Sequence, residues 1–161
     1  MQSATQKITP FLWFDDQAEE AAKFYVSVFT NSKITNVTHY AKATEKVSGK
    51  KQGTVMTVAF RLDGQDFVAL NGGPHFTITP AVSFVVNCET QDEVDAMWDR
   101  LSEGGDETAQ QCGWLKDKYG VSWQIVPTAL SELLSDPAKA ERVMSALLKM
   151  KKIDIAELKA A

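Results

Sequence analysis

The apolar positions at the start of the chain predict a strand followed by a helix. Residues 8–14 are almost wholly apolar, as is typical of a strand covered on both faces, and Pro10 places this strand at a sheet edge or near its own start. Asp15 and Asp16 then offer helix caps, and small and aromatic residues recur at helical spacing as far as Phe29. The chain therefore opens with one strand and one amphipathic helix.

Three further strands are expected after this helix. They cover residues 33–40, 55–62 and 65–70. The Asp63-Gly64 pair between the last two favours the tight turn of an antiparallel hairpin. A polar segment, residues 44–52, separates the first two and predicts a mobile loop that could lie over a cleft.

A second round of the same pattern begins near the middle of the chain. Residues 81–86 are another apolar run, and Thr90 to Glu93 have the pattern of a capping box that opens a helix as far as Leu101. Strands are then expected at residues 110–112, 113–116 and 121–126. The order is again a strand, a helix and three strands.

The two rounds can be laid over one another. The 73 positions that separate Glu20 from Glu93 also pair Phe24 with Met97 and Tyr25 with Trp98. A unit that cannot close its own core is expected to occur in more than one copy, so we interpret the pattern as an internal duplication. Chance similarity between two amphipathic helices is the alternative.

Residues 128–161 differ in character and predict helices. Asp136-Pro137 has the pattern of a cap followed by proline at the first helical position, an apolar stripe follows, and Asp154 can cap a last short helix. These helices are expected to cover the sheet or to pack on a partner subunit.

The composition fits one folded domain. Hydrophobic residues make up 44% of the 161 positions and charged residues 24%, and two independent cores in so short a chain would bury their surface poorly. We expect residues 1–161 to form a single domain, with modules at 8–73 and 81–127 and helices in 128–161.

Charge and cysteine usage exclude several classes of protein. The net charge of -4 gives no long-range attraction for a phosphate backbone, so no nucleic-acid partner is expected. No run approaches the roughly 20 apolar residues that cross a bilayer, and residues 1–7 are polar, so no membrane partner and a cytoplasmic location are expected. Cys88 and Cys112 form no CxxC pair, which argues against a disulfide framework or a zinc ribbon.

Several stretches of the sequence carry a resemblance to a known family. They are Ile8 to Phe14 with the following helix to Tyr25, Ala69 to Pro74, Gly113 to Asp117, and Gly120 to Pro127. On these stretches the chain resembles the vicinal oxygen chelate superfamily, which includes glyoxalase I, bleomycin-resistance proteins and extradiol dioxygenases. More narrowly, it resembles the PhnB-like branch labelled 3-demethylubiquinone-9 3-methyltransferase. The resemblance implies an α+β fold of two paired βαβββ modules whose curved sheets enclose a cavity, usually in a homodimer, with extra C-terminal helices here.

The resemblance also implies where a metal would be bound. In metal-using relatives the ligands are His, Glu or Gln at inward positions of the first and last strands of each module. The corresponding positions are Pro10, Ala69 or Asn71, Ala81 or Ser83, and Gln124. A catalytic cation normally has three ligands drawn from imidazole, carboxylate and thiolate, so we expect no metal and no other cofactor.

Without a metal, binding would depend on apolar and aromatic groups and a few polar ones in the cleft. The candidate ligand-binding residues are Gln124, Trp114, Cys112, Lys116, Asn71 and His75. Cys112, Trp114 and Lys116 alternate onto one face if that stretch is extended, and Gln124 is an amide on an otherwise apolar strand. Each of four candidates also has a structural alternative. Gln124 would be a structural amide with its hydrogen bonds made, Cys112 a buried thiol, Asn71 a turn residue and His75 an exposed histidine. Trp13 and Trp123 are expected to point toward the helices.

The sequence therefore predicts a protein that binds a small organic molecule, aromatic or quinone-like, in a cleft without metal. The alternative is an enzyme of lyase, isomerase or methyltransferase type that uses Gln124, Cys112 and neighbouring groups, although no catalytic role is assigned to any one of them. A purely structural dimer module is a third alternative. The glycine-rich loop after a parallel strand that usually holds a methyl donor is missing, because Gly72-Gly73 follows a hairpin strand. Methyl transfer is thus suggested by the family label alone.

Overall fold

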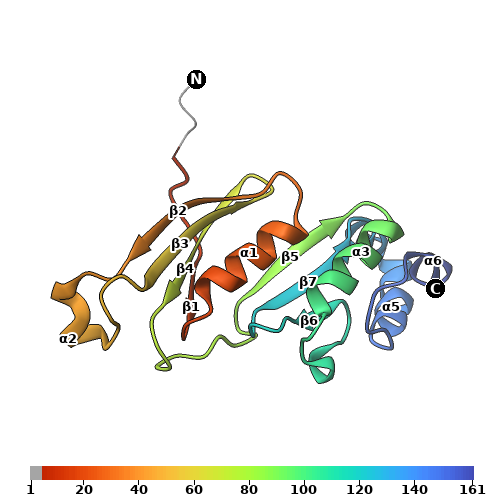
Figure 1. Ribbon diagram of the computed structural model, residues 1–161. Coiled ribbons are helices and arrows are strands. Elements are labelled where there is room, and N and C mark those ends of the chain that lie inside the picture. The colour runs from red at the N-terminus through yellow and green to blue at the C-terminus, as the bar shows by residue number, and fades with distance from the viewer. Residues whose placement is uncertain (1–4) are drawn as a thin grey trace. The chain divides into compact units, whose positions relative to one another are not determined.

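The computed structural model describes residues 5–161 and divides into two compact units between Ile78 and Thr79 (Figure 1). Residues 1–4, part of the polar start noted above, lie outside the described range. Each unit contains a small mixed sheet with one main helix, so the predicted α+β class is confirmed.

The first unit is a four-stranded sheet with strand order β1-β4-β3-β2. Its elements are β1 (Phe11–Phe14), α1 (Ala18–Val28), β2 (Lys33–His39), β3 (Val55–Leu62) and β4 (Gln65–Asn71). β1 pairs parallel with β4, whereas β3 pairs antiparallel with β2 and β4. The predicted hairpin over Asp63-Gly64 is confirmed, and both residues have the positive φ that such a turn requires.

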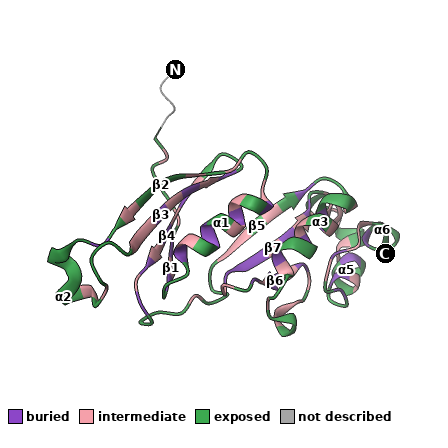
Figure 2. Cartoon of the chain, in the orientation of Figure 1, coloured by how far each residue is buried: buried purple, intermediate pink, exposed green. Residues whose placement is uncertain are grey.

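The core of this unit lies between α1 and one face of the sheet (Figure 2). Alanines at helical spacing let the helix approach closely, and Tyr25 stacks on Phe60, which stacks in turn on Phe67. Ring centroids in these two pairs are 6.1 and 5.5 Å apart. Offset aromatic pairs of this kind add to the stabilisation from buried area.

Trp13 lies on the other face of the sheet, so its predicted place in the helix-side core is wrong. It alternates with Leu12 and Phe14, which are buried against the helix. Its indole N–H donates to the carbonyl of Gly73 at 2.9 Å, and its ring packs edge-on against Phe76. The prediction exchanged the two faces of β1, as a shift of one residue along a strand does.

The residues of β4 alternate between the two faces of the sheet in register with those of β1. Ala69 and Asn71 are buried on the helix side, so the residues of β4 on the open face are Val68 and Leu70. The Asn71 side chain links three elements: Oδ1 accepts from the first N–H of α1, at Ala18, at 2.8 Å, and Nδ2 donates to Val55 O at 3.1 Å. This amide caps the helix from a distant strand, while the side chain of Gln17 at the N-cap makes no capping hydrogen bond.

Replacing Asn71 with alanine should lower the free energy of unfolding by about 2 kcal/mol, because a buried N–H and a partly buried carbonyl lose their partner. Urea denaturation would measure the loss. Asn36, exposed on β2, provides a matched control, for which the same change should cost less than about 0.5 kcal/mol. A loss at Asn71 no greater than at Asn36 would contradict this structural role.

The polar segment expected to be a loop contains helical turns. A 3-10 turn at Lys42–Thr44 runs into α2 (Glu45–Ser48), which ends at Gly49 in the left-handed region. Lys50 then donates to the backbone carbonyl of Asp15 at 3.1 Å. This segment is therefore attached beside the start of α1.

The second unit is a three-stranded sheet with strand order β5-β7-β6. Its elements are β5 (Ser83–Cys88), α3 (Gln91–Ser102), a 3-10 turn at Glu107–Ala109, β6 (Trp114–Lys116), β7 (Ser122–Pro127), α4 (Ala129–Ser135), α5 (Pro137–Leu147) and α6 (Ile155–Ala160). β5 pairs parallel with β7, as β1 does with β4. Both main helices begin the predicted 73 positions apart, at Ala18 and Gln91, which supports the interpretation of a repeat.

The strand expected at residues 110–112 is not a strand of this sheet, which was a wrong prediction. Gln111 makes only an isolated bridge to Trp114, and the N–H groups of Cys112 and Gly113 donate to Met150 and Lys151 rather than to a neighbouring strand. Within the described residues, the second module is thus one strand short of the βαβββ pattern. α4 was not predicted.

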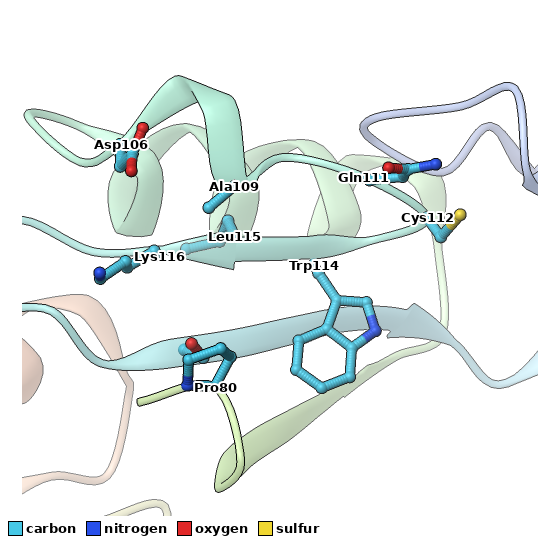
Figure 3. Close-up of a pocket in the computed structure, with 9 residues that line it drawn as sticks. Pro80, Asp106, Ala109, Gln111, Cys112, Trp114, Leu115 and Lys116 are labelled. Carbon is cyan, nitrogen blue, oxygen red and sulfur yellow. The ribbon is translucent and has the colours of Figure 1, made fainter. Parts of the chain in front are cut away.

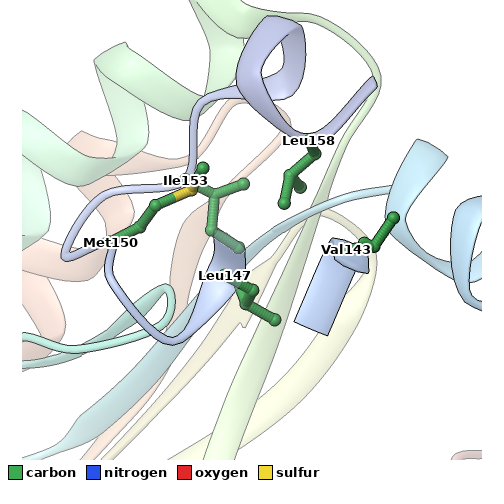
Figure 4. Packing of buried hydrophobic residues seen from close by; sticks show 5 residues of the cluster. All are labelled: Val143, Leu147, Met150, Ile153 and Leu158. Atoms are coloured by element: carbon green, nitrogen blue, oxygen red, sulfur yellow. The ribbon is translucent and has the colours of Figure 1, made fainter. Parts of the chain in front are cut away.

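The C-terminal helices enclose a cluster of their own (Figure 4). Its buried members are Val143, Leu147, Met150, Ile153 and Leu158. The caps predicted at Asp136 and Asp154 are confirmed, since each carboxylate accepts a backbone N–H of the helix that follows it.

Candidate functional site

One face of the second sheet carries three of the six candidate residues. Strand pairing places Gln124 opposite both Val85 and Trp114, and Lys116 opposite Ser122, so these side chains share a face. The alternate residues of β6 and β7 are buried in the core, and one of them is Trp123, whose expected position toward the helix is confirmed. Val85 is 49% exposed, which shows that this face is open within the unit.

A pocket of about 460 Å³ lies at the β6 end of this face (Figure 3). It is lined by Pro80, Asp106, Ala109, Gln111, Cys112, Trp114, Leu115, Lys116 and Ser122. The fold therefore brings the predicted residues Cys112, Trp114 and Lys116 together in one pocket. Figure 3 shows the indole of Trp114 projecting from β6 on the side of Pro80.

The pocket holds one carboxylate and one ammonium group. Asp106 is held by Thr108, whose hydroxyl and backbone N–H donate to it at 2.6 and 2.9 Å. These hydrogen bonds lower the pKa of Asp106, and the charge of Lys116 adds a smaller effect in the same direction. The two ionised groups can serve a ligand that both donates and accepts hydrogen bonds.

Gln124 already has a polar partner on the same face. Its Nε2 donates to the hydroxyl of Ser83 on β5 at 2.9 Å. The amide oxygen and the serine hydroxyl together present a donor and an acceptor beside Trp114, the strand neighbour of Gln124.

The two cysteines have different surroundings. Cys112 is partly buried and packs against the C-terminal cluster, and its sulfur is directed away from Trp114 (Figure 3). Cys88 is 1% exposed, and burial, together with the charge of Glu93, raises the pKa of its thiol to about 11. Cys88 is therefore a protonated core thiol at neutral pH.

The remaining two candidates belong to the first unit. Asn71 is buried, with its amide engaged between α1 and β3, and it also borders a hollow beside Lys50 and Thr54. His75 is exposed in the turn after β4. A ligand contact by either residue stays a prediction.

Sequence reasoning missed several residues that line the pocket and one residue that holds a turn next to it. Pro80, Asp106 and Ala109 enter from connections whose positions depend on the tertiary fold, and no local pattern indicates them. No role was predicted for the Asp117 side chain, whose carboxylate accepts from Trp123 Nε1 at 2.8 Å and closes the turn between β6 and β7. An aspartate at the start of a short turn that ends in glycine is the signal that could have indicated it.

The residues present do not fit the metal centre implied by the resemblance. Among residues 5–161, no group of three or more His, Cys, Asp or Glu side chains could hold a metal ion. The open face of β4 carries Val68 and Leu70, and that of β5 carries Ser83, none of which is a usual catalytic ligand.

The Gly72-Gly73 pair does not fit a methyl-donor loop either. A Cβ on Gly72 would overlap the ring of Trp13, and the Gly73 carbonyl accepts from that same indole. The pair thus lets Trp13 pack on the backbone.

None of the helices in the described part of the chain is long and apolar enough to cross a membrane.

Comparisons with known proteins identify the family. The model of the 3-demethylubiquinone-9 3-methyltransferase family matches residues 6–126. A PhnB protein from Bacillus cereus, which carries the same methyltransferase name, is 39% identical over 76% of this chain and 100% of its own, with a TM-score of 0.66. No curated protein matches the chain.

Two more distant structures share the fold alone. A Pseudomonas aeruginosa protein is 18% identical over 76% of this chain and 98% of its own, with a TM-score of 0.58. A fosfomycin resistance protein from Listeria monocytogenes is 14% identical over 81% of this chain and 98% of its own, with a TM-score of 0.50. The chain therefore belongs to the PhnB-like 3-demethylubiquinone-9 3-methyltransferase family.

Proposed function

We propose that this protein binds a small aromatic or quinone-like molecule in the pocket beside β6, without a metal ion. The observation that carries the proposal is the half-buried indole of Trp114 at a pocket of about 460 Å³ that also contains opposite charges. Stacking on an indole favours a flat ring, and a pocket of this size is in the usual range for small ligands.

The polar groups favour a ring with oxygen substituents. The Lys116 ammonium can donate to a ring carbonyl or phenolate, and the Asp106 carboxylate can accept from a ring hydroxyl. The Gln124–Ser83 pair offers a further donor and acceptor on the same face. A quinone and its reduced hydroquinone both carry groups of this kind.

The family name gives independent support for this ligand class. The Bacillus cereus relative is named for a demethylated ubiquinone, which contains such a ring. The name also favours a second candidate function, methyl transfer to that ring, but the glycine pair used by Trp13 does not fit a methyl-donor loop. Ligand binding is therefore the better supported function.

Assembly and location are part of the proposal. A homodimer is expected from the resemblance to the superfamily, and analytical ultracentrifugation of the full chain would test it. A cytoplasmic location stays a prediction, which fractionation of cells that express the chain would test.

The binding test uses three probes and the purified full chain. Duroquinone and 4-hydroxybenzoate provide oxygen-substituted rings, and 4-hydroxycyclohexanecarboxylate is the saturated match for 4-hydroxybenzoate. At a ligand concentration ten times Kd, an aromatic probe should raise Tm by about 3 °C, whereas the saturated acid should not.

Replacing Trp114 with alanine should weaken binding of the aromatic probe about tenfold, as measured by titration calorimetry, because the stacking surface is lost. Trp114→Phe keeps a ring and should bind within about threefold of wild type. Lys116→Gln should also weaken binding, with exposed Lys149→Gln as its matched control. Equal affinity of wild type and Trp114→Ala, or no stabilisation by either aromatic probe, would refute the proposal.

A further inference from the structure

We propose that the C-terminal extension, residues 128–161, is part of the ligand site because it fixes the turn that positions Trp114. The family match ends at residue 126, so the extension lies beyond the part of the chain that the family model covers. The effect on ligand affinity rests on the proposed function, whereas the positioning of Trp114 can be measured without a ligand.

The turn in question is the two-residue connection at Cys112-Gly113. Gln111 and Trp114 exchange backbone hydrogen bonds at 3.1 and 2.8 Å, which closes the turn directly before β6. Cys112 has φ 54° and Gly113 φ 84°, the positive values that a type I′ turn requires at both central positions.

Cysteine is an unusual residue for the first of these positions. Asparagine followed by glycine is the favoured pair, and a residue with an ordinary Cβ pays about 1 to 2 kcal/mol in the left-handed region. The turn therefore needs support from outside its own sequence, because its local preference opposes the conformation observed.

The extension supplies that support. The N–H groups of Cys112 and Gly113 each donate at 2.8 Å, to the carbonyls of Met150 and Lys151 respectively. The Ile153 side chain, 1% exposed, lies against Gly113, where an added Cβ would be 2.8 Å from Ile153 Cδ1. The strand expected here from the sequence is thus replaced by a turn held by the extension.

α3 in turn holds this part of the extension in place. The Gln91 side chain donates to Ile153 O at 3.1 Å and accepts from Ile155 N at 2.9 Å. Lys152 pairs with Asp95 on the same helix at 2.8 Å. Gln91 does not line the Trp114 pocket, so it is a positioning residue that acts through the extension and the turn.

Weakening this attachment should lower the fraction of molecules in which Trp114 is in its binding position, and the apparent Kd rises by the inverse of that fraction. We expect Gln91→Ala to weaken duroquinone binding about fivefold. In the ligand-free protein labelled with 5-fluorotryptophan, the Trp114 resonance, assigned with Trp114→Phe, should shift or broaden.

Two further variants separate positioning from general stability. Asp136→Ala also removes a side chain to backbone bond in the extension, at the start of α5, and should leave both readouts unchanged. Cys112→Asn installs the favoured Asn-Gly turn, so adding it to Gln91→Ala should return the affinity to within about twofold of Cys112→Asn alone, and it should restore the resonance.

The outcomes are distinguishable. A Trp114 resonance that does not respond to Gln91→Ala, or that responds equally to Asp136→Ala, overturns the inference. Failure of Cys112→Asn to restore the resonance overturns the role assigned to the turn. If the resonance responds and is restored but wild type binds none of the probes, the positioning role stands and the proposed function fails.

Discussion

Replacing Asp117 with alanine should lower the free energy of unfolding by about 3 to 5 kcal/mol, measured by urea denaturation. The residue is 3% exposed and its carboxylate serves three donors. Oδ1 accepts from Tyr119 N at 2.8 Å and from Val121 N at 3.0 Å, and Oδ2 accepts from Trp123 Nε1 at 2.8 Å. Alanine leaves all three without this acceptor in a region from which water is largely excluded.

Two variants make this prediction specific. Asp117→Asn keeps an oxygen for the two backbone donors but turns an N–H toward the indole, so it should cost about 2 kcal/mol. Asp106 also caps a turn with its carboxylate, yet it is exposed, and Asp106→Ala should cost less than about 1 kcal/mol. Similar losses at Asp117 and Asp106 would contradict the importance assigned to burial.

The turn at Asp117 also matters for the pocket. It joins β6 to β7 and fixes the pairing of Lys116 with Ser122, both of which line the pocket. Part of the stretch that carries the family resemblance is therefore structural, since Gly113, Asp117 and Trp123 all maintain the shape of this hairpin. The motif therefore indicates the fold, and by itself it does not assign a catalytic or ligand-binding role to these residues.

The secondary structure was predictable where local patterns decide it. Helical spacing, the N-cap at Thr90 and the Asp63-Gly64 turn each depend on residues close in sequence, and all three are confirmed. The second bond of the predicted capping box is shifted by one residue, because the Glu93 carboxylate accepts from Glu89 N. The face of a strand is harder to predict, because a shift of one residue exchanges its two faces. Such a shift placed Trp13 with the helix and Asn71 on the open face.

The site was predictable only in part, for a related reason. Trp114 and Lys116 lie two positions apart on one strand, so alternation alone groups them. The strand expected just before them depends on neighbours that a local pattern does not contain. The carbonyls of Met150 and Lys151, distant in sequence, take the hydrogen bonds that this strand would have needed.

Replacing Gly113 with alanine should lower the free energy of unfolding by about 3 to 5 kcal/mol, for two separate reasons. Its φ of 84° is unfavourable for a residue with a Cβ. The added carbon would also lie 2.9 Å from the carbonyl oxygen of Ile125 and 2.8 Å from Ile153 Cδ1. The isoleucine tip can rotate, but the carbonyl belongs to β7 and moves only with the sheet.

Gly120 separates these two costs. It has nearly the same φ, 87°, but a Cβ there would approach only Lys116 Cε, at 3.8 Å. Gly120→Ala therefore carries the backbone cost alone, about 1 to 2 kcal/mol, and the excess at Gly113 measures the closeness of the turn to β7 and the extension. An equal loss at both glycines in urea denaturation would show that the Cys112-Gly113 turn is not tightly enclosed, and it would weaken the case that the extension holds Trp114 in place.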